Sequence, residues 1–236
     1  MANDSETSEP IVVLEGVTKT YRQGEVEVPA LRGLDLRVAP GEFLALTGPS
    51  GSGKTTALNL IGALDRPTQG KVIVDGRDLG ALGRGARSRL RRDRIGFVFQ
   101  AYNLVPVLTA YENAEMVMRL QGTDAKERRE RVMSLLREVG LGGMEDRRPT
   151  QLSGGQQQRV AIARAIASGP AVTLADEPTA NVDSTTADKL LDIMERLNRE
   201  RGATFIFSTH DPRVMERARR VVHMVDGRVE RDEARA

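Results

Sequence analysis

Short runs of aliphatic and β-branched residues open the chain, and Gly or Pro separates one run from the next. Runs of this length and composition predict β-strands rather than helices. They are IVVLEGVTKTY (residues 11–21), VPALRGLDLRV (28–38) and EFLALTG (42–48), followed after a helical stretch by a hairpin pattern, GKVIVDGRDL (70–79).

The pattern changes between Tyr102 and Gly140, where apolar residues recur at the three-to-four-residue spacing of amphipathic helices. Beyond this region a buried strand (171–178), a long helix (185–202) and a second apolar strand (204–211) follow in order. Strands that alternate with helices predict a parallel sheet, so the fold class is α/β. A final hairpin is expected around Asp226-Gly227.

Composition narrows the class of protein. The chain has 236 residues, of which 39% are hydrophobic, enough for one large globular domain or two small lobes. Its 35 Lys and Arg nearly balance 33 Asp and Glu, so no nucleic-acid partner is implied. There is no Cys, which excludes disulfides and thiolate metal sites. The N-terminal ten residues lack the pattern of a secretory signal, and no run has the roughly 18 apolar residues of a membrane span.

Arginine-rich segments stand at residues 87–94, 126–131 and 216–220. Acidic residues lie within or beside them, which favours solvated helix faces with ion pairs between residues four apart. The alternative is a surface that faces a membrane or a partner protein.

The strongest chemical motif is GPSGSGKTT, residues 48–56, which lies between a predicted strand and a predicted helix. Its glycines allow backbone N–H groups to converge on phosphate oxygens, Lys54 adds a positive charge, and the Thr55 hydroxyl is suited to Mg²⁺. The segment therefore predicts a nucleotide phosphate site made of Gly48, Pro49, Ser50, Gly51, Ser52, Gly53, Lys54, Thr55 and Thr56.

Two carboxylates follow one another where the strand at 171–178 ends. Successive strand residues point to opposite sides, so Asp176 and Glu177 need not share a task. Asp176 is suited to the Mg²⁺ shell, and Glu177 to a water aligned on the γ-phosphate. Without the phosphate loop the same pair would read as two surface acids in a turn.

A second glycine-rich turn occurs in LSGGQ, residues 152–156. Ser153 with Gln156 predicts a capping box at the start of a helix. Gly154 and Gly155 weaken that first turn by roughly 1 kcal/mol each, which an ordinary capped helix does not explain. Their lack of side chains suits close approach of an oxygen-rich ligand to the backbone.

These motifs, in this order, resemble those of the ATP-binding cassette proteins. GPSGSGKT looks like their Walker A loop, LSGGQ is their signature word, and VTLADEP resembles their Walker B strand. The resemblance implies an ATPase cassette with a parallel-sheet core, an N-terminal antiparallel β-subdomain and a helical subdomain. It also implies that two copies pair head to tail, each ATP with its Mg²⁺ lying between the Walker A loop of one copy and the signature of the other.

The same resemblance assigns four further residues. Tyr21 resembles the aromatic residue that stacks on adenine, Gln100 the glutamine that senses Mg²⁺ and the attacking water, and His210 the switch histidine at the γ-phosphate. Asp183 resembles the acidic residue of the D-loop at the dimer interface. Taken alone, each has a plain structural alternative, such as a half-buried strand tyrosine or a hydrogen-bonding histidine.

The D-loop, TANVD at residues 179–183, differs from the commoner sequence Ser-Ala-Leu-Asp. Asn181 puts the detailed contacts of that loop in doubt, and polar Thr173 interrupts the usually apolar Walker B run. Neither difference removes a catalytic group.

The resemblance also implies a division of the chain. A disordered tail is expected at residues 1–10, an ATP-binding core lobe at 11–99 and 166–236, and a helical lobe at 100–165 that ends in the signature helix. Together they form a single cassette domain.

Segments 64–79, 97–113 and 176–184 resemble the ATPases of the lipoprotein-release and macrolide-exporter group. The ending at residues 218–229 is similar to the same group, including its heterocyst-exporter relatives. That resemblance implies a separate permease with four transmembrane segments per subunit and a location on the cytoplasmic face of the inner membrane, held by that permease. The segment after Gln100 is the candidate docking surface, or else ordinary packing of the helical lobe, with Tyr102, Leu104, Pro106 and Tyr111.

Other cassette proteins fit the sequence less well. A DNA-repair type would carry a long coiled coil between the Walker A loop and the signature, and a translation type would normally carry two cassettes. An ATP-gated regulator that moves a membrane partner to control cell-wall hydrolases stays open. The transported substrate also stays open, since lipoprotein, peptide, macrolide and lipid are all compatible.

Overall fold

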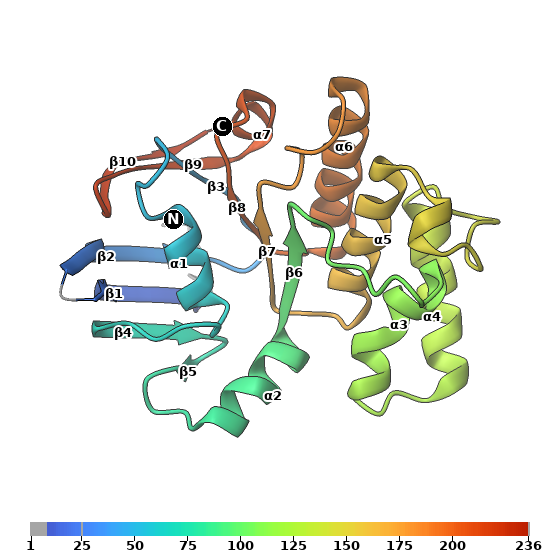
Figure 1. Cartoon of the computed structure of the whole chain (residues 1–236), viewed down its shortest axis with the longest axis horizontal. Helices are drawn as coiled ribbons and strands as arrows, with labels where there is room; N and C mark the ends of the chain where they lie inside the picture. The colour runs from blue at the N-terminus through green and yellow to red at the C-terminus, as the bar shows by residue number, and fades with distance from the viewer. Residues whose placement is uncertain (1–8, 25, 236) are drawn as a thin grey trace, which may run out of the picture.

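The computed structural model describes residues 9–24 and 26–235. Most of the tail expected at residues 1–10 lies outside the described residues. The described chain holds two sheets and a group of helices, arranged side by side in Figure 1. The strand of the Walker B motif, Val172–Asp176, and the loops around it lie between the first sheet and the group of helices.

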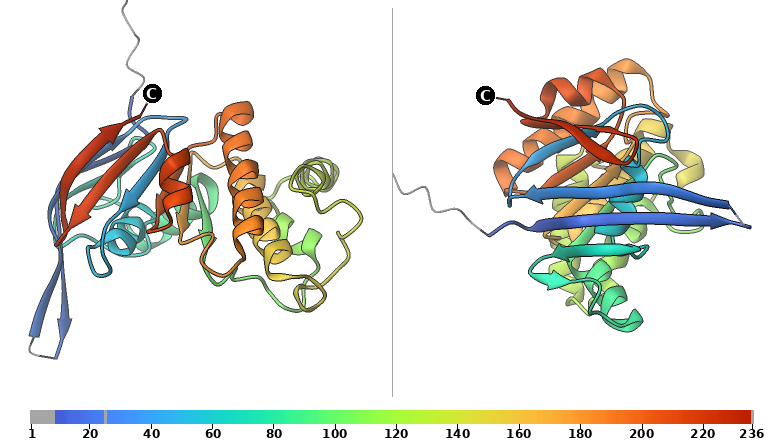
Figure 2. Two further views of the ribbon diagram at one scale, coloured as in Figure 1. Left: turned by 90° about the horizontal axis from the view of Figure 1, so that it is seen from above. Right: turned by 90° about the vertical axis from the view of Figure 1, so that its left-hand side faces the viewer.

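The first sheet is antiparallel and comes from the N-terminal third of the chain. Its strand order is β2-β1-β4-β5. The strands are β1 (Val12–Gln23), β2 (Val26–Val38), β4 (Gln69–Val74) and β5 (Arg77–Asp78). Figure 2 shows the far end of the β1–β2 pair extending away from the rest of the molecule.

The second sheet has the order β10-β9-β3-β8-β7-β6. Strands β9, β3, β8, β7 and β6 are parallel to their neighbours, and β10 is antiparallel to β9. Because the carboxyl ends of parallel strands meet at one edge, the loops that follow β3, β6, β7 and β8 come together there. The strands are β3 (Phe43–Thr47), β6 (Ile95–Phe99), β7 (Val172–Asp176), β8 (Phe205–Ser208), β9 (Arg220–Val225) and β10 (Arg228–Ala234).

Helices cover this sheet, and α3, α4 and α5 stand on the side remote from the first sheet (Figures 1 and 2). A one-turn 3₁₀ helix (Pro149–Gln151) precedes α5. The helices are α1 (Lys54–Ile61), α2 (Arg84–Arg94), α3 (Ala110–Leu120), α4 (Ala125–Glu138), α5 (Gly154–Ala167), α6 (Ser184–Arg201) and α7 (Pro212–Arg217).

Both faces of the second sheet are buried, as the near-continuous apolar strands predict. On one face Leu44 and Ile206 pack with α1 and the antiparallel sheet. On the other, Phe43, Phe205 and Phe207 pack with α5 and α6, and the Phe43 and Phe207 ring centroids lie 4.6 Å apart. Alternate residues of a strand thus serve two separate cores.

The structure corrects one expectation about the arginine-rich segments. Their ion pairs in the described chain mostly join different elements instead of residues four apart on one helix. Arg94 at the end of α2 pairs with Asp75 in the β4–β5 turn at 2.6 Å, and Arg128 on α4 pairs with Glu115 on α3 at 2.5 Å. These arginines therefore tie elements together.

Among the described residues, no helix has both the length and the apolar character needed to cross a membrane.

Candidate nucleotide-binding site

Two glycines give the loop after β3 its shape. Gly48 and Gly53 have φ of 144° and 99°, which side-chain-bearing residues rarely adopt. A Cβ on Gly48 would lie 2.1 Å from the carbonyl oxygen of Met224, and one on Gly53 would lie 2.6 Å from that of Ala30. The loop is thus held against β9 and β2 so closely that only glycine fits.

The loop leads directly into α1, whose N-terminus is open. Gly53 is the N-cap, so no side chain caps this helix in the described part of the chain. The first backbone N–H groups are therefore available to an anion. Lys54 is 9% exposed, and its Nζ donates to the carbonyl oxygens of Gly48 and Pro49 at 2.8 and 3.0 Å. Its positive charge is thereby held at the loop.

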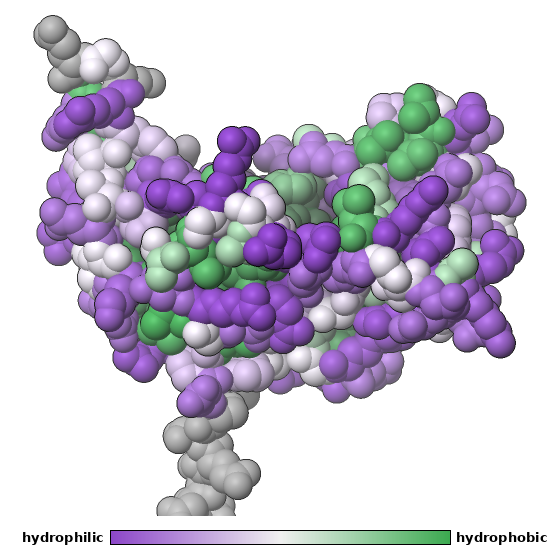
Figure 3. All heavy atoms as spheres, turned by 90° about the horizontal axis from the view of Figure 1, so that it is seen from below, coloured by the Kyte–Doolittle hydropathy of each residue, from purple (hydrophilic) through white to green (hydrophobic). Residues whose placement is uncertain are grey.

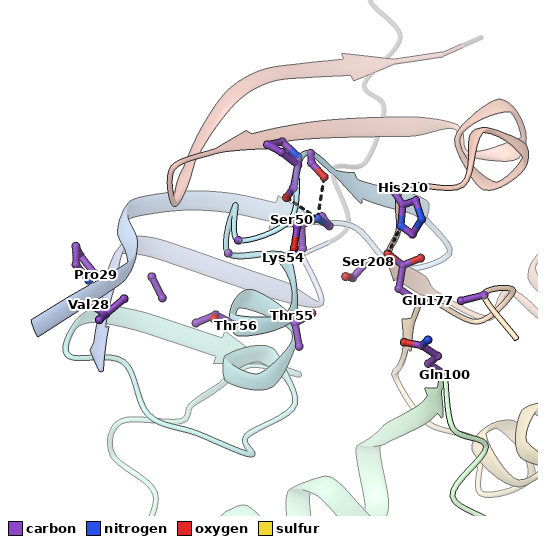
Figure 4. A pocket seen from close by; sticks show the side chains of 16 residues that line it. Val28, Pro29, Ser50, Lys54, Thr55, Thr56, Gln100, Glu177, Ser208 and His210 are labelled. Atoms are coloured by element: carbon purple, nitrogen blue, oxygen red, sulfur yellow. Dashed lines mark hydrogen bonds and ion pairs between the residues drawn. The ribbon is translucent and has the colours of Figure 1, made fainter. Parts of the chain in front are cut away.

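A cleft of about 690 Å³ opens over this loop and reaches the carboxyl edge of the second sheet. Figure 4 shows the loop with Lys54 on one side and Gln100, Glu177 and His210 on the other. Of the predicted site, the residues that line the cleft are Gly48, Pro49, Ser50, Gly51, Gly53, Lys54, Thr55, Thr56, Gln100, Glu177 and His210.

Thr55 and Asp176 come together as the sequence predicts. The Thr55 hydroxyl donates to Asp176 Oδ1 at 3.2 Å, although the two residues are 121 positions apart. A hydroxyl and one carboxylate beside a phosphate loop suit Mg²⁺, which prefers oxygen ligands and usually completes its shell with phosphates and water. The donor set of this chain therefore fits that ion.

Glu177 has an unusual backbone, with φ of 46°. Its N–H donates to the carbonyl oxygen of Ser208 at 2.9 Å, which ties the residue to the end of β8. Its Oε1 lies 2.7 Å from His210 Nδ1, and its Oε2 accepts a hydrogen bond from Thr209 Oγ1 at 3.2 Å. Both carboxylate oxygens thus have a partner, and the group is oriented at the cleft opposite Lys54.

The sequence did not reveal some of the lining residues, namely Ser208, Ala180 and the β2 residues Val28, Pro29 and Ala30. Ser208 Oγ is buried and has no hydrogen-bond partner among the residues that the structure describes. A buried hydroxyl left free at a cleft is open to a ligand or water. Its position at the carboxyl end of β8, two residues before His210, was the available signal.

Ser153 caps α5 as predicted. Its side chain accepts from the N–H of Gln156, whose side chain accepts in turn from the N–H of Ser153 at 2.9 Å. The two glycines also have a packing role that the sequence did not show. A Cβ on Gly154 would lie 2.8 Å from Tyr102 Oη, and one on Gly155 would lie 2.3 Å from Thr186 Cγ2. None of residues 153–156 lines the chain's own cleft.

Asp183 likewise lies outside the cleft lining. It is the N-cap of α6, accepting from the Thr186 N–H at 3.0 Å and from Thr186 Oγ1 at 2.7 Å. The hydrogen bond from the Thr186 side chain, followed by that from its N–H, lowers the pKa of this carboxyl below its ordinary value. Its predicted role at a dimer interface stays a prediction.

Tyr21 does not line the cleft either, but it pairs across the hairpin with Val28, which does. Its hydroxyl donates to Asp65 Oδ2 at 3.1 Å, and Lys19 Nζ lies 4.8 Å from the ring centroid. Burial raises the pKa of Tyr21, and the hydrogen bond to Asp65 adds to that effect. Adenine stacking on this ring remains a prediction.

A glycine loop between a strand and an open helix, beside a hydroxyl, a carboxylate and a second oriented carboxylate, defines a P-loop nucleoside triphosphatase. Residues 31–180 match the family described as ABC transporter. The chain therefore belongs to the ABC transporter family. It is an ATPase that uses ATP with Mg²⁺.

Relatives of known name agree with this family. The chain is 53% identical to the lipoprotein-releasing system ATP-binding protein LolD of Anaeromyxobacter dehalogenans, covering 94% of each chain. It is 50% identical to the macrolide export ATP-binding/permease protein MacB of Syntrophobacter fumaroxidans. That match covers 93% of this chain but 31% of MacB, so the chain spans about a third of that relative's length.

Among solved structures, the chain resembles the ATP-binding cassette MJ0796, a protein of Methanocaldococcus jannaschii. The dimeric post-hydrolysis form of MJ0796 with ADP and Pi matches with a TM-score of 0.87 and 45% identity. The match covers 94% of this chain and 98% of that chain, so the predicted cassette fold is confirmed.

Proposed function

We propose that the chain is the ATP-hydrolysing subunit of a membrane exporter of the lipoprotein-release or macrolide-export type. In this proposal two copies enclose two ATP molecules and drive a separate permease. Names of close relatives support the type, and the two sets of site residues in this chain support the pairing.

Each copy contributes a phosphate-binding half of a site. The N–H groups of the loop and of α1, together with Lys54, bind the phosphates. Glu177 accepts a proton from the attacking water, while His210 holds its carboxylate in place and faces the γ-phosphate. Gln100, which lies on the same side of the cleft as Glu177 and His210, positions the same water.

Thr55, Asp176 and Gln100 are the residues that would hold Mg²⁺. When bound, the ion would neutralise negative charge on the phosphate oxygens.

The main support for the dimer is the location of the signature, residues 152–156. Ser153 and the two glycines after it lie outside the cleft of their own chain, at an exposed helix N-terminus. Such a terminus is suited to an anion, and a second copy in head-to-tail arrangement would bring it over the phosphates. The dimeric structures of MJ0796 support the pairing of two copies.

We further propose that residues 100–165 form a helical lobe against a core lobe of 11–99 and 166–236. A groove of about 380 Å³ lies where α2 and β6 face α3. Its apolar residues include Leu64, 49% exposed, and Leu120, 63% exposed. Figure 3 views the side of the molecule on which α2 lies and shows apolar surface among strongly hydrophilic side chains.

We propose that the permease docks in this groove. In the segment expected from sequence, Leu104 and Tyr111 are partly buried and pack against the helical core. Asn103 is the residue of that segment that lines the groove. A permease held here would keep the chain at the cytoplasmic face of the inner membrane.

Leu120→Glu tests the groove by placing a charge on its apolar lining. The chain, tagged and expressed in its own cells, would be purified from detergent-solubilised membranes. The unaltered chain should recover an integral-membrane subunit with four spans, and the variant should lose it, since a charged side chain would replace an exposed apolar contact of the groove.

Val26→Glu is the matched control. Val26 is also 63% exposed, but it lies on β2 outside the groove. This variant should recover the membrane subunit normally. Equal recovery with both variants would place docking elsewhere, and a recovered activator of cell-wall hydrolases would favour the regulator over the exporter.

A further inference from the structure

Asn181 of the D-loop makes two contacts with the loop that follows β6. Its Nδ2 donates to the carbonyl oxygen of Gln100 at 3.0 Å. Its own carbonyl oxygen accepts from Tyr102 Oη at 3.2 Å. The side chain and the backbone of one residue thus clamp two positions of a segment about 80 residues away.

The same tyrosine hydroxyl reaches the signature helix. A Cβ on Gly154, the first residue of α5, would lie 2.8 Å from Tyr102 Oη and 3.8 Å from the carbonyl oxygen of Asn181. The Gln100 loop, the D-loop and the N-terminus of α5 therefore meet at one point. Glycine at position 154 is what allows them to come so close.

The Gln100 loop is held in an unusual conformation. Tyr102 and Asn103 have φ of 59° and 49°, a left-handed region that costs side-chain-bearing residues energy. The Arg164 guanidinium on α5 donates to the carbonyl oxygens of both residues, at 2.9 Å to Tyr102. Burial lowers the pKa of Arg164. The helix that begins with the signature thus also fixes the loop that presents Gln100.

We propose that Asn181 is a positioning residue that couples the two nucleotide sites of the dimer. Gln100 lines the cleft of its own chain, whereas Gly154 belongs to the signature that faces the partner's ATP in the proposed dimer. Asn181 joins these two ends through Tyr102 without lining the cleft itself. The inference rests on the proposed dimer, but its contacts lie within one chain.

The position of the clamp decides which kinetic parameter should change. Loss of one amide-to-carbonyl hydrogen bond changes the position of Gln100 without removing a contact to ATP. We expect kcat to fall about fivefold, the effect of a single net hydrogen bond, with little change in the KM for ATP. Because the coupling between sites is also lost, the Hill coefficient of hydrolysis should fall toward one.

Two substitutions test the clamp from its two ends. Asn181→Asp keeps the size of the side chain but loses the donor to Gln100, and Tyr102→Phe removes only the hydroxyl. Both should lower kcat and the Hill coefficient, and the double variant should be less impaired than the product of the two single effects. Melting temperature is measured for each variant.

Gln121→Glu is the control, because Gln121 Nε2 donates to the carbonyl oxygen of Arg92 at 3.2 Å, a bond of the same kind away from the nucleotide cleft. It should leave kcat and the Hill coefficient unchanged. If Asn181→Asp or Tyr102→Phe still forms ATP-dependent dimers and hydrolyses ATP at the normal rate, the role proposed for the clamp is wrong. The proposed function would not be affected by that result. An unaltered chain that forms no ATP-dependent dimer would overturn the proposed function, and the coupling of sites with it.

Discussion

Glu177 is oriented by three neighbours at once: the Ser208 carbonyl, the Thr209 hydroxyl and the His210 ring. Glu177→Gln preserves the length and most hydrogen bonding of the side chain but removes its basic carboxylate. Hydrolysis should therefore fall by roughly two orders of magnitude or more, while ATP still binds and the ATP-bound dimer accumulates.

Phosphate release and gel filtration with ATP measure the two effects separately. Since Gln can occupy the same backbone conformation as Glu, the melting temperature should stay close to that of the unaltered chain. A variant with near-normal turnover would refute the assignment of Glu177 as the base.

At the scale of residues, the sequence predicted those groups whose chemistry is local. Gly48, Lys54 and Thr55 stand in one continuous motif, and Glu177 follows a strand end, so each could be assigned from its neighbours. Ser208 could not, because its hydroxyl matters only through burial beside Glu177, which no local pattern encodes. Asn181 was identified only as a difference from the common D-loop sequence. Its contacts could not be predicted, because its partners lie about 80 residues away.

The packing of α5 against α6 depends on the missing side chain of Gly155. Ala at this position would favour the helix by about 1 kcal/mol, but its Cβ would lie 2.3 Å from Thr186 Cγ2. Thr186 is held by Asp183, so it cannot turn away without losing a hydrogen bond. Gly155→Ala should therefore lower the melting temperature despite the better helix propensity.

Adding Thr186→Ser should restore stability to Gly155→Ala. Serine lacks the Cγ2 methyl group and keeps the hydroxyl that donates to Asp183. Thermal unfolding of both single variants and the double variant measures the effect as non-additivity. If Gly155→Ala alone were as stable as the unaltered chain, the close contact would not constrain this helix pair.

At the scale of elements, periodicity predicted the strands and helices well, because their burial follows the alternation of apolar residues. The interactions between elements were less predictable. The arginines of α2 and α4 were expected to pair along their own helices, but Arg94 reaches Asp75 and Arg128 reaches Glu115. Long arginine side chains pair with whichever carboxylates the fold brings near them. The spacing of residues along one helix does not show which carboxylates those are.

For the whole molecule, the separation of the two glycine-rich turns is the main result. The sequence predicted both turns and the cassette fold, but not that the start of α5 would also be packed against Tyr102 and Thr186. The signature glycines therefore have a role within one chain, besides the role proposed across the dimer. An experiment on the shared site must disable the signature without disturbing that packing.

Ser153→Arg keeps both packed glycines, because Ser153 is exposed and precedes them, although it removes the capping hydrogen bonds between Ser153 and Gln156. It places bulk and positive charge at the helix end, whereas Lys54→Ala damages the phosphate loop. Homodimers of either variant have two broken sites. A mixed dimer has one site with both lesions and one with none, so mixing the two inactive proteins should restore single-turnover hydrolysis that is greatest near equal amounts. Steady-state turnover of the mixed dimer is expected to stay low if both sites must hydrolyse ATP in each cycle. If subunits are shown to exchange by a labelled-chain assay and the mixture is still inactive, the signature does not complete the partner's site.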